Sequence, residues 1–400
     1  MSASSYEAPS SVRAAGASAP GASDSLAAAR RVLADLVVSG DHAAHILYAL
    51  EVLGAPWLQR HGLAPLAYVR YQTLADLLDE LRAELKRAYY AALADTALLH
   101  QSELVAVLKA LSDCDIVAVP FKGAALAFTV YPNPACRPMG DLDLWVTAAE
   151  MDAAQRALER IGYQYVSNPD RSPALLDRFI GERQMVGTRF GTGWVELHWR
   201  VFVGEWLRRT ALVDENAVRQ RLCPTDRLGL PPITLLAPED AVLQLLVHTA
   251  VNHQFSMSVL RSLIDVTLLA RSAPLDWTAV AERARIWRIA TVTWLGLSLA
   301  IDLVGLSEAR AILPRLAPSR LRQACLARLV NADRIVTLTD VSASRSRFIL
   351  LLLMVDRKRD MLKLVFRTLW PERKWLIARY GHYTFSTRLH HFFNAARGRI

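Results

Sequence analysis

FKGAA (residues 121–125) and GDLDL (residues 140–144) are the two stretches of this 400-residue chain that decide its fold. The first closes a short β-branched run at residues 116–121 and continues into an apolar segment that predicts a helix over residues 123–130. The second extends to residue 146 with alternating polar and apolar side chains, which predicts a half-buried strand. Strand, turn, helix and strand in this order indicate a small α+β unit.

The two acids of GDLDL lie two residues apart in the predicted strand. Asp141 and Asp143 therefore face one side of the sheet, while Leu142 and Leu144 face the core. Two neighbouring carboxylates repel each other unless a cation lies between them, so neutralising an exposed Asp143 without a cation should leave stability unchanged or raise it. Carboxylate oxygens suit Mg2+, which binds one or two carboxylates together with substrate phosphates. A solvated strand face is the alternative for an isolated D-x-D pair.

A third carboxylate occurs in VELHW at residues 195–199. The alternation predicts a strand over residues 193–200, joined through the Gly-Thr-Gly turn before it to a strand over residues 183–190. Glu196 and His198 share one face of this strand. If the strand lies beside the GDLDL strand, three carboxylates converge within roughly 8 Å, as needed to hold two metal ions for displacement at phosphorus. His198 either is hydrogen-bonded within the sheet or orients Glu196 or an acceptor.

The turn at Lys122 and Gly123 offers a different kind of ligand. A strand that ends in Gly and turns into a helix presents backbone N–H groups to an anion such as a phosphate. Lys122 lies either in solvent at this turn or beside the phosphates as a cation. Arg137, in the loop that precedes GDLDL, is a candidate to bind a phosphate or a carboxylate.

The rest of the chain predicts helices on both sides of this unit. The fold class is therefore α+β, with a small mixed β-sheet flanked by N-terminal and C-terminal helical regions. Five segments are expected in order: a disordered tail at 1–25, an N-terminal helical region at 26–113, the α+β core at 114–204, a helical domain at 205–342, and a basic C-terminal helical segment at 343–400.

Local signals predict where several helices begin and end. Asp41 is a plausible N-cap, and Gly54 is the matching C-terminal stop. Thr147 and Glu150 have the spacing of a capping box, which opens a helix that ends near Gly162. Capping residues at helix starts and glycines at helix ends are therefore predicted in both the helical region and the α+β core.

The second half returns to helix at Pro238, which suits a first helical turn. His248 and His253 would lie about 140° apart on one helix, so we do not expect them to bind a metal jointly. Residues 289–306 and 348–355 are apolar, but the first segment is interrupted by polar residues and the second is too short to cross a bilayer. Both segments predict buried helices.

The net charge of +9 is concentrated at the C-terminal end. Residues 343–400 hold 13 Lys and Arg against 3 Asp and Glu, so the remainder is nearly neutral and nucleic acid is not expected as a partner. This segment mixes basic and apolar residues, which suits either a solvated helix surface or peripheral contact with a membrane or polyanion. The 4 cysteines are too scattered for a zinc site or a disulfide framework, so we expect a cytoplasmic protein.

The combined motif carries a resemblance to a known family. KGAALAFTVYPNPACRPMGDLDLWV at residues 122–146, followed by VELHW, resembles an uncharacterised nucleotidyltransferase-like family of the DNA polymerase beta superfamily. Members of that family share K-G, Y-P, R and D-[IL]-D-L, then E-L-H-W. The similarity extends over roughly residues 30–385, through LAPED at residues 236–240 and the Trp-Pro pair at 370–371.

The resemblance implies two sets of site residues. The catalytic acids and metal ligands, for Mg2+ or alternatively Mn2+, would be Asp141, Asp143 and Glu196. The nucleotide-binding residues would be Lys122, Gly123, Ala124 and Arg137, with His198 as an acceptor-binding or orienting residue. The wider superfamily usually has a Gly-Ser pair where this chain has Gly123 and Ala124, so a hydroxyl contact to phosphate is missing.

The sequence thus predicts a Mg2+-dependent nucleotidyltransferase that moves a nucleoside monophosphate from an NTP to an acceptor hydroxyl or phosphate. The acceptor, whether a small molecule, saccharide, peptide or protein, cannot be identified from the residues. Two alternatives of other classes stay open. One is a non-catalytic nucleotide-binding or interaction module, which Ala124 favours, and the other is a membrane-surface or polyanion-binding protein that acts through residues 343–400.

Overall fold

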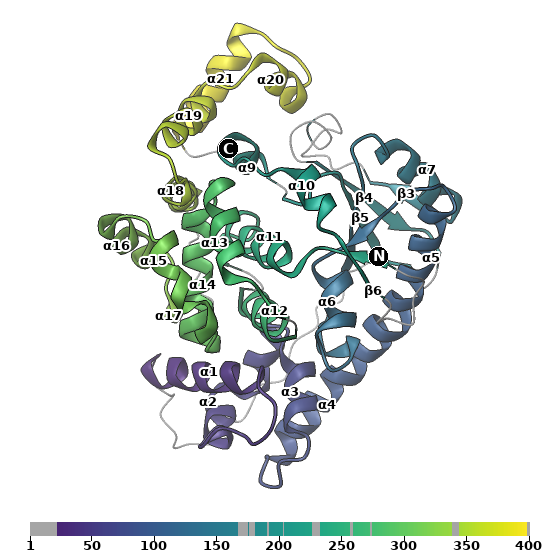
Figure 1. Cartoon of the computed structure of the whole chain (residues 1–400), viewed down its shortest axis with the longest axis vertical. Coiled ribbons are helices and arrows are strands. Elements are labelled where there is room, and N and C mark those ends of the chain that lie inside the picture. Colours follow the sequence, from purple (N-terminus) through teal and green to yellow (C-terminus); the bar gives the residue numbers. More distant parts are fainter. Residues whose placement is uncertain are drawn as a thin grey trace, which may run out of the picture.

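The computed structural model of the chain describes residues 22–166, 175, 181–189, 192–202, 204–225, 233–256, 259–272, 274–337 and 344–397. Residues 1–21, most of the predicted disordered tail, lie outside this set, and the first helix begins at Ala22. The predicted fold class is confirmed, because a small mixed sheet is surrounded by helices from both ends of the chain (Figure 1).

The main sheet has five strands in the order β1-β2-β5-β4-β3. The strands are β1 (Val119–Pro120), β2 (Asp141–Trp145), β3 (Tyr163–Tyr165), β4 (Glu182–Gly187) and β5 (Trp194–His198). β2 and β5 are parallel, and the other neighbouring strands are antiparallel. β1 is shorter than the predicted strand because Pro120 has no N–H to donate to a partner.

Three short strands were not predicted from the sequence. They are β3 and the pair β6 (Cys223–Thr225) and β7 (Ile233–Leu235), which form a separate two-stranded sheet. Each has only three residues, which is too short a segment for an alternation of polar and apolar residues to be detected. The predicted hairpin is confirmed as far as its strands, β4 and β5, pair antiparallel; part of its turn, residues 190–191, lies outside the described residues.

One face of the sheet is covered by two helices. Leu142 and Leu144 are fully buried and pack with α5 (Gln101–Ser112) and α7 (Met151–Arg160), as their alternation predicted. The predicted capping box opens α7: the Glu150 backbone N–H donates to Thr147 Oγ1 (3.2 Å), and the Thr147 N–H donates to Glu150 Oε2 (2.9 Å). The opposite face, which carries the two Asp side chains, is left for the site.

The helices before the sheet form two groups. They are α1 (Ala22–Asp35), α2 (Ile46–Arg60), α3 (Ala64–Tyr71), α4 (Asp79–Ala92), the π-helical segment η1 (Leu93–His100) and α5. α1 contacts helices from the second half of the chain, whereas α5 packs on the sheet. Within the core, α6 (Gly123–Thr129) and the 3-10 turn η2 (Pro134–Cys136) connect β1 to β2.

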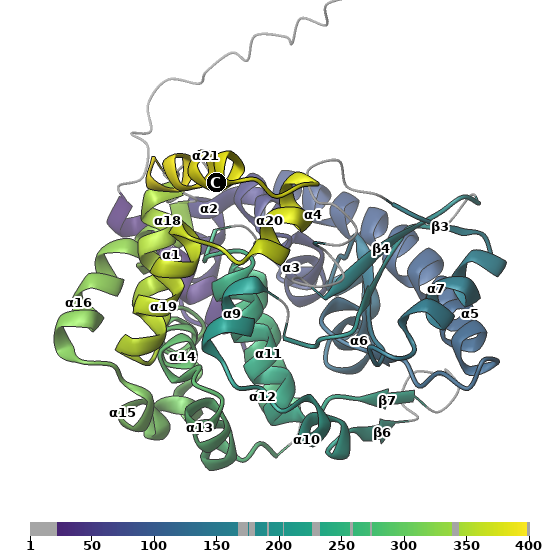
Figure 2. The same ribbon diagram turned by 90° about the horizontal axis from the view of Figure 1, so that it is seen from above.

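The second half of the chain is almost entirely helical. Its helices are α9 (Glu205–Thr210), α10 (Glu215–Gln220), α11 (Pro238–Val251), α12 (Val259–Ser272), α13 (Trp277–Ile286), α14 (Ala290–Val304), η4 (Ser307–Ile312), α15 (Leu313–Leu316), α16 (Arg320–Leu329), α17 (Ala332–Thr337), α18 (Ser344–Met354), α19 (Lys358–Leu369), α20 (Arg373–Tyr380) and α21 (Phe385–Ala396). α11 lies between α14 and the sheet in both views (Figure 1 and Figure 2).

The predicted buried helix over residues 289–306 is confirmed. α14 fills most of that segment and contributes many buried apolar residues to the helical core, which also includes α1. Among the described residues, no helix has both the length and the apolar character needed to span a membrane.

The predicted start of the second helix was wrong, because α2 begins at Ile46 rather than after Asp41. The predicted stop at Gly54 holds locally: Gly54 has non-helical backbone angles (φ 68°, ψ 168°) and ends the first helical part. After this kink the chain resumes the helix around Pro56, so α2 continues to Arg60. Trp57, which follows Pro56, is buried and donates to Val336 O (2.8 Å), so packing beyond the kink holds the second part in place.

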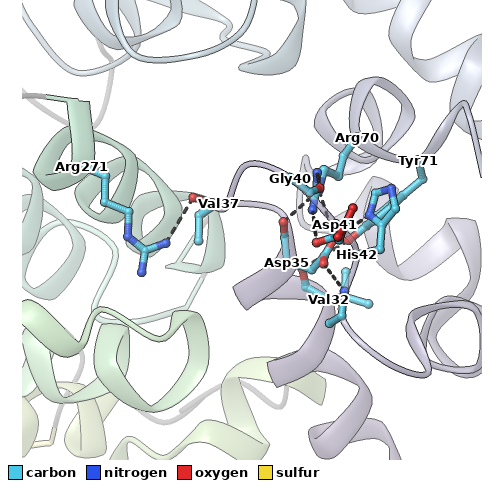
Figure 3. A network of polar contacts seen from close by, with 10 residues as sticks. Val32, Asp35, Val37, Gly40, Asp41, His42, Arg70, Tyr71 and Arg271 are labelled. Atoms are coloured by element: carbon cyan, nitrogen blue, oxygen red, sulfur yellow. Dashed lines mark hydrogen bonds and ion pairs between the residues drawn. The ribbon is translucent and has the colours of Figure 1, made fainter.

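Asp35, at the end of α1, connects the loop between α1 and α2 to α3 (Figure 3). Its carboxylate accepts hydrogen bonds from the Ala43 N–H (2.7 Å) and Arg70 Nε (3.1 Å) and lies 3.2 Å from His42 Nδ1. Burial alone would raise the pKa of Asp35, but these hydrogen bonds and the charge of Arg70 outweigh it and lower the pKa. Asp35 is therefore ionised and held by partners on two segments, the loop before α2 and helix α3.

We expect Asp35→Asn to lower the free energy of unfolding by about 2–4 kcal/mol at pH 7, because Arg70 loses its buried counter-charge. The folded-state pKa is lowered, so this contribution is present above the unfolded pKa, near 4, and is lost as the pH falls below it. Urea titrations at pH 7 and in acid measure both effects. Asp302→Asn, which breaks an exposed pair with Arg30, is the control and should cost under about 0.5 kcal/mol.

Candidate active site

Lys122 has an unusual backbone conformation at the turn between β1 and α6. Its φ of 51° and ψ of −129° are uncommon for a residue with a side chain and persist only where the surroundings hold them. The surroundings here include Asp143, whose Oδ1 lies 2.7 Å from Lys122 Nζ. Burial would lower the pKa of Lys122, but Asp143 and Glu196 outweigh it and raise the pKa. Lys122 is thus a buried, charged partner of Asp143 and does not lie in solvent.

Asp143 has a second cationic partner in His198. The two side chains are buried, and His198 Nε2 lies 2.8 Å from Asp143 Oδ1. Burial would lower the pKa of His198, but hydrogen bonds to Asp143 and Glu196 raise it to about 9, so the ring is protonated at neutral pH. Burial likewise opposes ionisation of Asp143, yet Lys122 and His198 hold its pKa well below the usual range. The premise that Asp143 is an exposed acid was wrong.

Glu196 lies directly beside Asp143 on the neighbouring parallel strand. The two residues are in register, and single ligand atoms of Asp143, Glu196 and His198 lie within 4.8 Å of one another. Glu196 Oε1 accepts from Gln184 Nε2 (2.9 Å), while Oε2 lies 3.5 Å from His198 Nε2. Burial would raise the pKa of Glu196, but His198 outweighs it and lowers the pKa. The expected meeting of β2 and β5 is therefore present.

Asp141 lies at the start of β2 on the same face, at the partly exposed edge of this group. Its oxygens are not among the three ligand groups within 4.8 Å. Burial and the negative charges of Asp143 and Glu196 raise the pKa of Asp141 to about 6, against the opposing effect of Lys122. Asp141, unlike Asp143, is therefore destabilised by neighbouring carboxylates, as its position in the sequence predicted.

Arg137 is held by a buried carboxylate from α12. Its Nη2 donates to Asp265 Oδ2 (2.9 Å), and the Tyr131 hydroxyl donates to Asp265 Oδ1 (2.6 Å). Arg137 also lies against Gly123, where an added Cβ would come within 2.6 Å of Arg137 Nη1. Gly123 is therefore required for this contact. Ala124, the next residue, is fully buried in the core of the sheet.

Two histidines come together in a way that the sequence argument did not foresee. His253 Nε2 lies 2.9 Å from His248 Nε2, with ring centroids 4.6 Å apart. The 140° estimate does not apply because α11 ends at Val251 and His253 turns back towards it. Burial and the charge of Lys122 lower the pKa of both rings, so the pair shares its hydrogen bond in neutral form.

A pocket of about 420 Å³ lies beyond the carboxyl ends of β2 and β5. Its lining includes Trp145, Trp199, Glu215 and Arg219, and the Arg219 guanidinium lies 4.5 Å over the Trp145 ring. Trp145, which lines the pocket, is the register partner of His198 on β5, and His198 contacts Asp143. None of the three acids is among the described residues that line the pocket.

A family model described as an uncharacterised nucleotidyltransferase matches residues 55–305. The match spans more than half of the chain, which therefore belongs to this family of nucleotidyltransferases, as its motifs predicted. No curated protein gave a match. The matched region contains all the residues of the acidic group and ends directly after α14.

The different surroundings of the two Asp residues predict opposite effects on stability. In metal-free buffer with chelator, Asp141→Asn should raise the free energy of unfolding by roughly 1–2 kcal/mol at pH 8, because it removes repulsion. Asp143→Asn should lower it by about 3–5 kcal/mol, because Lys122 and His198 lose their counter-charge.

The pH dependence separates these effects from a general loss of packing. Since the folded-state pKa of Asp141 is raised to about 6, its ionisation costs stability as the pH rises from about 4 to 6, and the advantage of Asp141→Asn should disappear below that window. Urea titrations from pH 4 to 8 measure this. Equal shifts of the same sign for both variants would contradict the assignment of partners.

Proposed function

We propose that this chain is a Mg2+-dependent nucleotidyltransferase, which transfers a nucleoside monophosphate from an NTP to an acceptor hydroxyl or phosphate and releases pyrophosphate. The observation that carries the proposal is the register of Asp143 beside Glu196 on parallel strands, with Asp141 on the same face. Membership of a nucleotidyltransferase family supports nucleotidyl transfer in general. The proposed metal ligands are these three acids.

The donor set fits a hard divalent cation. Carboxylate oxygens are the ligands that Mg2+ prefers, and Mn2+ would suit the same oxygens. The raised pKa of Asp141 indicates that its own negative charge is not compensated, whereas Asp143 already has the Lys122 ammonium 2.7 Å from its Oδ1. When bound, the metal would lower the pKa of the acceptor and neutralise charge on the triphosphate.

The remaining residues of the group have proposed roles in binding and orientation. When a nucleotide binds, the Lys122 ammonium would leave Asp143 and contact a phosphate oxygen instead. The Nε2–H of protonated His198 would keep Asp143 and Glu196 in position, which makes His198 a positioning residue. Gly123 lets the Arg137 guanidinium lie against the turn, and Arg137 would add positive charge beside a phosphate bound there.

The acceptor remains open between a small molecule, a saccharide, a peptide and a protein. Nucleic acid is not proposed, since the basic excess lies in residues 343–400 and outside the matched family region. The four cysteines are free, which supports the proposed cytoplasmic setting.

One observation favours the alternative of a non-catalytic nucleotide-binding module. Ala124 replaces the usual Ser of the superfamily and is buried in the core, so the turn offers backbone groups but no hydroxyl. A module of this kind would bind an NTP without releasing pyrophosphate. Both functions therefore predict that the protein binds an NTP, but only the enzyme would release pyrophosphate.

Thermal-shift measurements with ATP, GTP, CTP and UTP, each with Mg2+ or Mn2+, test the proposal. At least one NTP should stabilise the protein in a metal-dependent manner, by about 2.7 kcal/mol at a hundredfold excess over its Kd. Glu196→Gln should abolish this stabilisation, because it removes a proposed ligand charge at a partly exposed position.

Glu159→Gln is the matched control, because Glu159 is an exposed acid of α7 away from the group, and this variant should respond as the parent does. Pyrophosphate release with candidate acceptors then separates the enzyme from a binding module. Unchanged metal-dependent binding by Glu196→Gln would remove the three-acid metal site from consideration.

A further inference from the structure

The last three helices form one connected unit at the end of the molecule away from α1 and α2 (Figure 1). His391 of α21 lies at its centre: Nε2 donates to Thr368 O (2.9 Å), and Nδ1 accepts from the Tyr380 hydroxyl (2.9 Å). The Arg388 guanidinium also lies 5.0 Å over the Trp370 ring. α19, α20 and α21 are therefore fixed relative to one another.

The outer side of α19 combines exposed apolar and basic residues. Leu362 and Phe366 are 68% and 64% exposed, far more than apolar residues of a packed helix. Arg359 and Lys363 lie on the same side, and the four residues fall within about 100° around the helix. We name Arg359, Leu362, Lys363 and Phe366 of α19 the C-terminal basic surface. Exposed apolar residues also occur on α21, at Phe385 (65%) and Phe393 (54%), and on α20, at Ile377.

The acids of this segment leave its positive charge largely uncompensated. Asp356 accepts from the Ala290 and Thr291 N–H groups (both 2.8 Å), and so caps α14. Asp360 is buried and pairs with Arg288 (3.1 Å), and its Oδ1 also lies 4.0 Å from Lys363 Nζ. Two of the three acids are thus turned to the body of the protein, while Arg359 and Lys363 remain exposed beside Leu362.

The inner side of α19 borders an apolar pocket of about 260 Å³. Leu364 and Trp375 are among its lining residues, and Arg209 and Arg367 are its charged members. This pocket lies on the side of α19 opposite Leu362 and Phe366, so it is separate from the C-terminal basic surface. A nucleic acid or an acidic peptide would use the charges of that surface but not its exposed Leu and Phe side chains.

We propose that the C-terminal basic surface binds anionic phospholipid and holds the protein peripherally on a membrane. Leu362 and Phe366 would enter the boundary between headgroups and acyl chains, and Arg359 and Lys363 would contact the headgroup phosphates. The alternation of long basic side chains with apolar ones suits such an interface, because the apolar stems can lie along the lipid. No membrane span is involved, and the proposal is independent of nucleotidyl transfer.

Co-sedimentation of the full chain with vesicles tests this proposal. We expect binding to vesicles of phosphatidylcholine with about one-third phosphatidylglycerol, weaker binding at high salt, and little binding to phosphatidylcholine alone. Leu362→Ser with Phe366→Ser should reduce the partition coefficient at least about tenfold. Arg359→Gln with Lys363→Gln should also weaken binding and reduce its salt dependence.

The matched control is Ile286→Ser with Leu321→Ser, which removes two apolar residues that are 69% and 78% exposed on α13 and α16, each beside arginines. It should change the partition less than about twofold. Circular dichroism melting verifies that each variant is folded, and the two α19 double variants provide independent tests if one is not.

Three outcomes would overturn the proposal. The parent could fail to bind anionic vesicles, or the α19 variants could bind as the parent does. The parent could also bind heparin or polyglutamate but not vesicles, which would assign the surface to an acidic macromolecule instead.

Discussion

The site depends on one buried carboxylate with two cationic partners. Asp143 brings together the turn at Lys122, strand β2 and strand β5, and the last of these supplies His198. A buried carboxylate is costly unless its charge and hydrogen-bonding capacity are satisfied, so the three segments are stable in this arrangement only together. Lys122 keeps an uncommon backbone conformation with positive φ, and its ammonium contacts Asp143 in that conformation. The exposed side of the group is left to Asp141, which carries the unrelieved negative charge.

Several parts of this arrangement could be predicted because they depend on local periodicity. The alternation in GDLDL and VELHW predicted which side chains face the core, and the capping box at Thr147 predicted where α7 begins. The partners of these residues depend on register and on contacts between distant segments. Gln184 lies opposite Glu196 only because β4 pairs with β5 in one register. Asp265, which holds Arg137, is 128 residues away from it in sequence. No spacing rule connects such residues.

The expected end of the second helix was incomplete because of tertiary packing. Gly54 interrupts the helix as predicted, but Trp57 is buried and hydrogen-bonded to α17, so a second helical part follows the kink. α1 and α2 share one core with α11 and α14, and no local signal indicates such contacts. The error for His253 has a different origin, because His253 was placed on a helix that ends two residues before it.

The cap that Asp356 places on α14 has a consequence for how the chain can be divided. The match to the family model ends at residue 305, but the first turn of the last helix within it is completed by a carboxylate about fifty residues further on. A shortened chain that ended after α14 would leave those N–H groups without this acceptor. The boundary of the matched region is therefore not a boundary of cooperative folding, and we expect the segment that carries Asp356 to unfold together with α14.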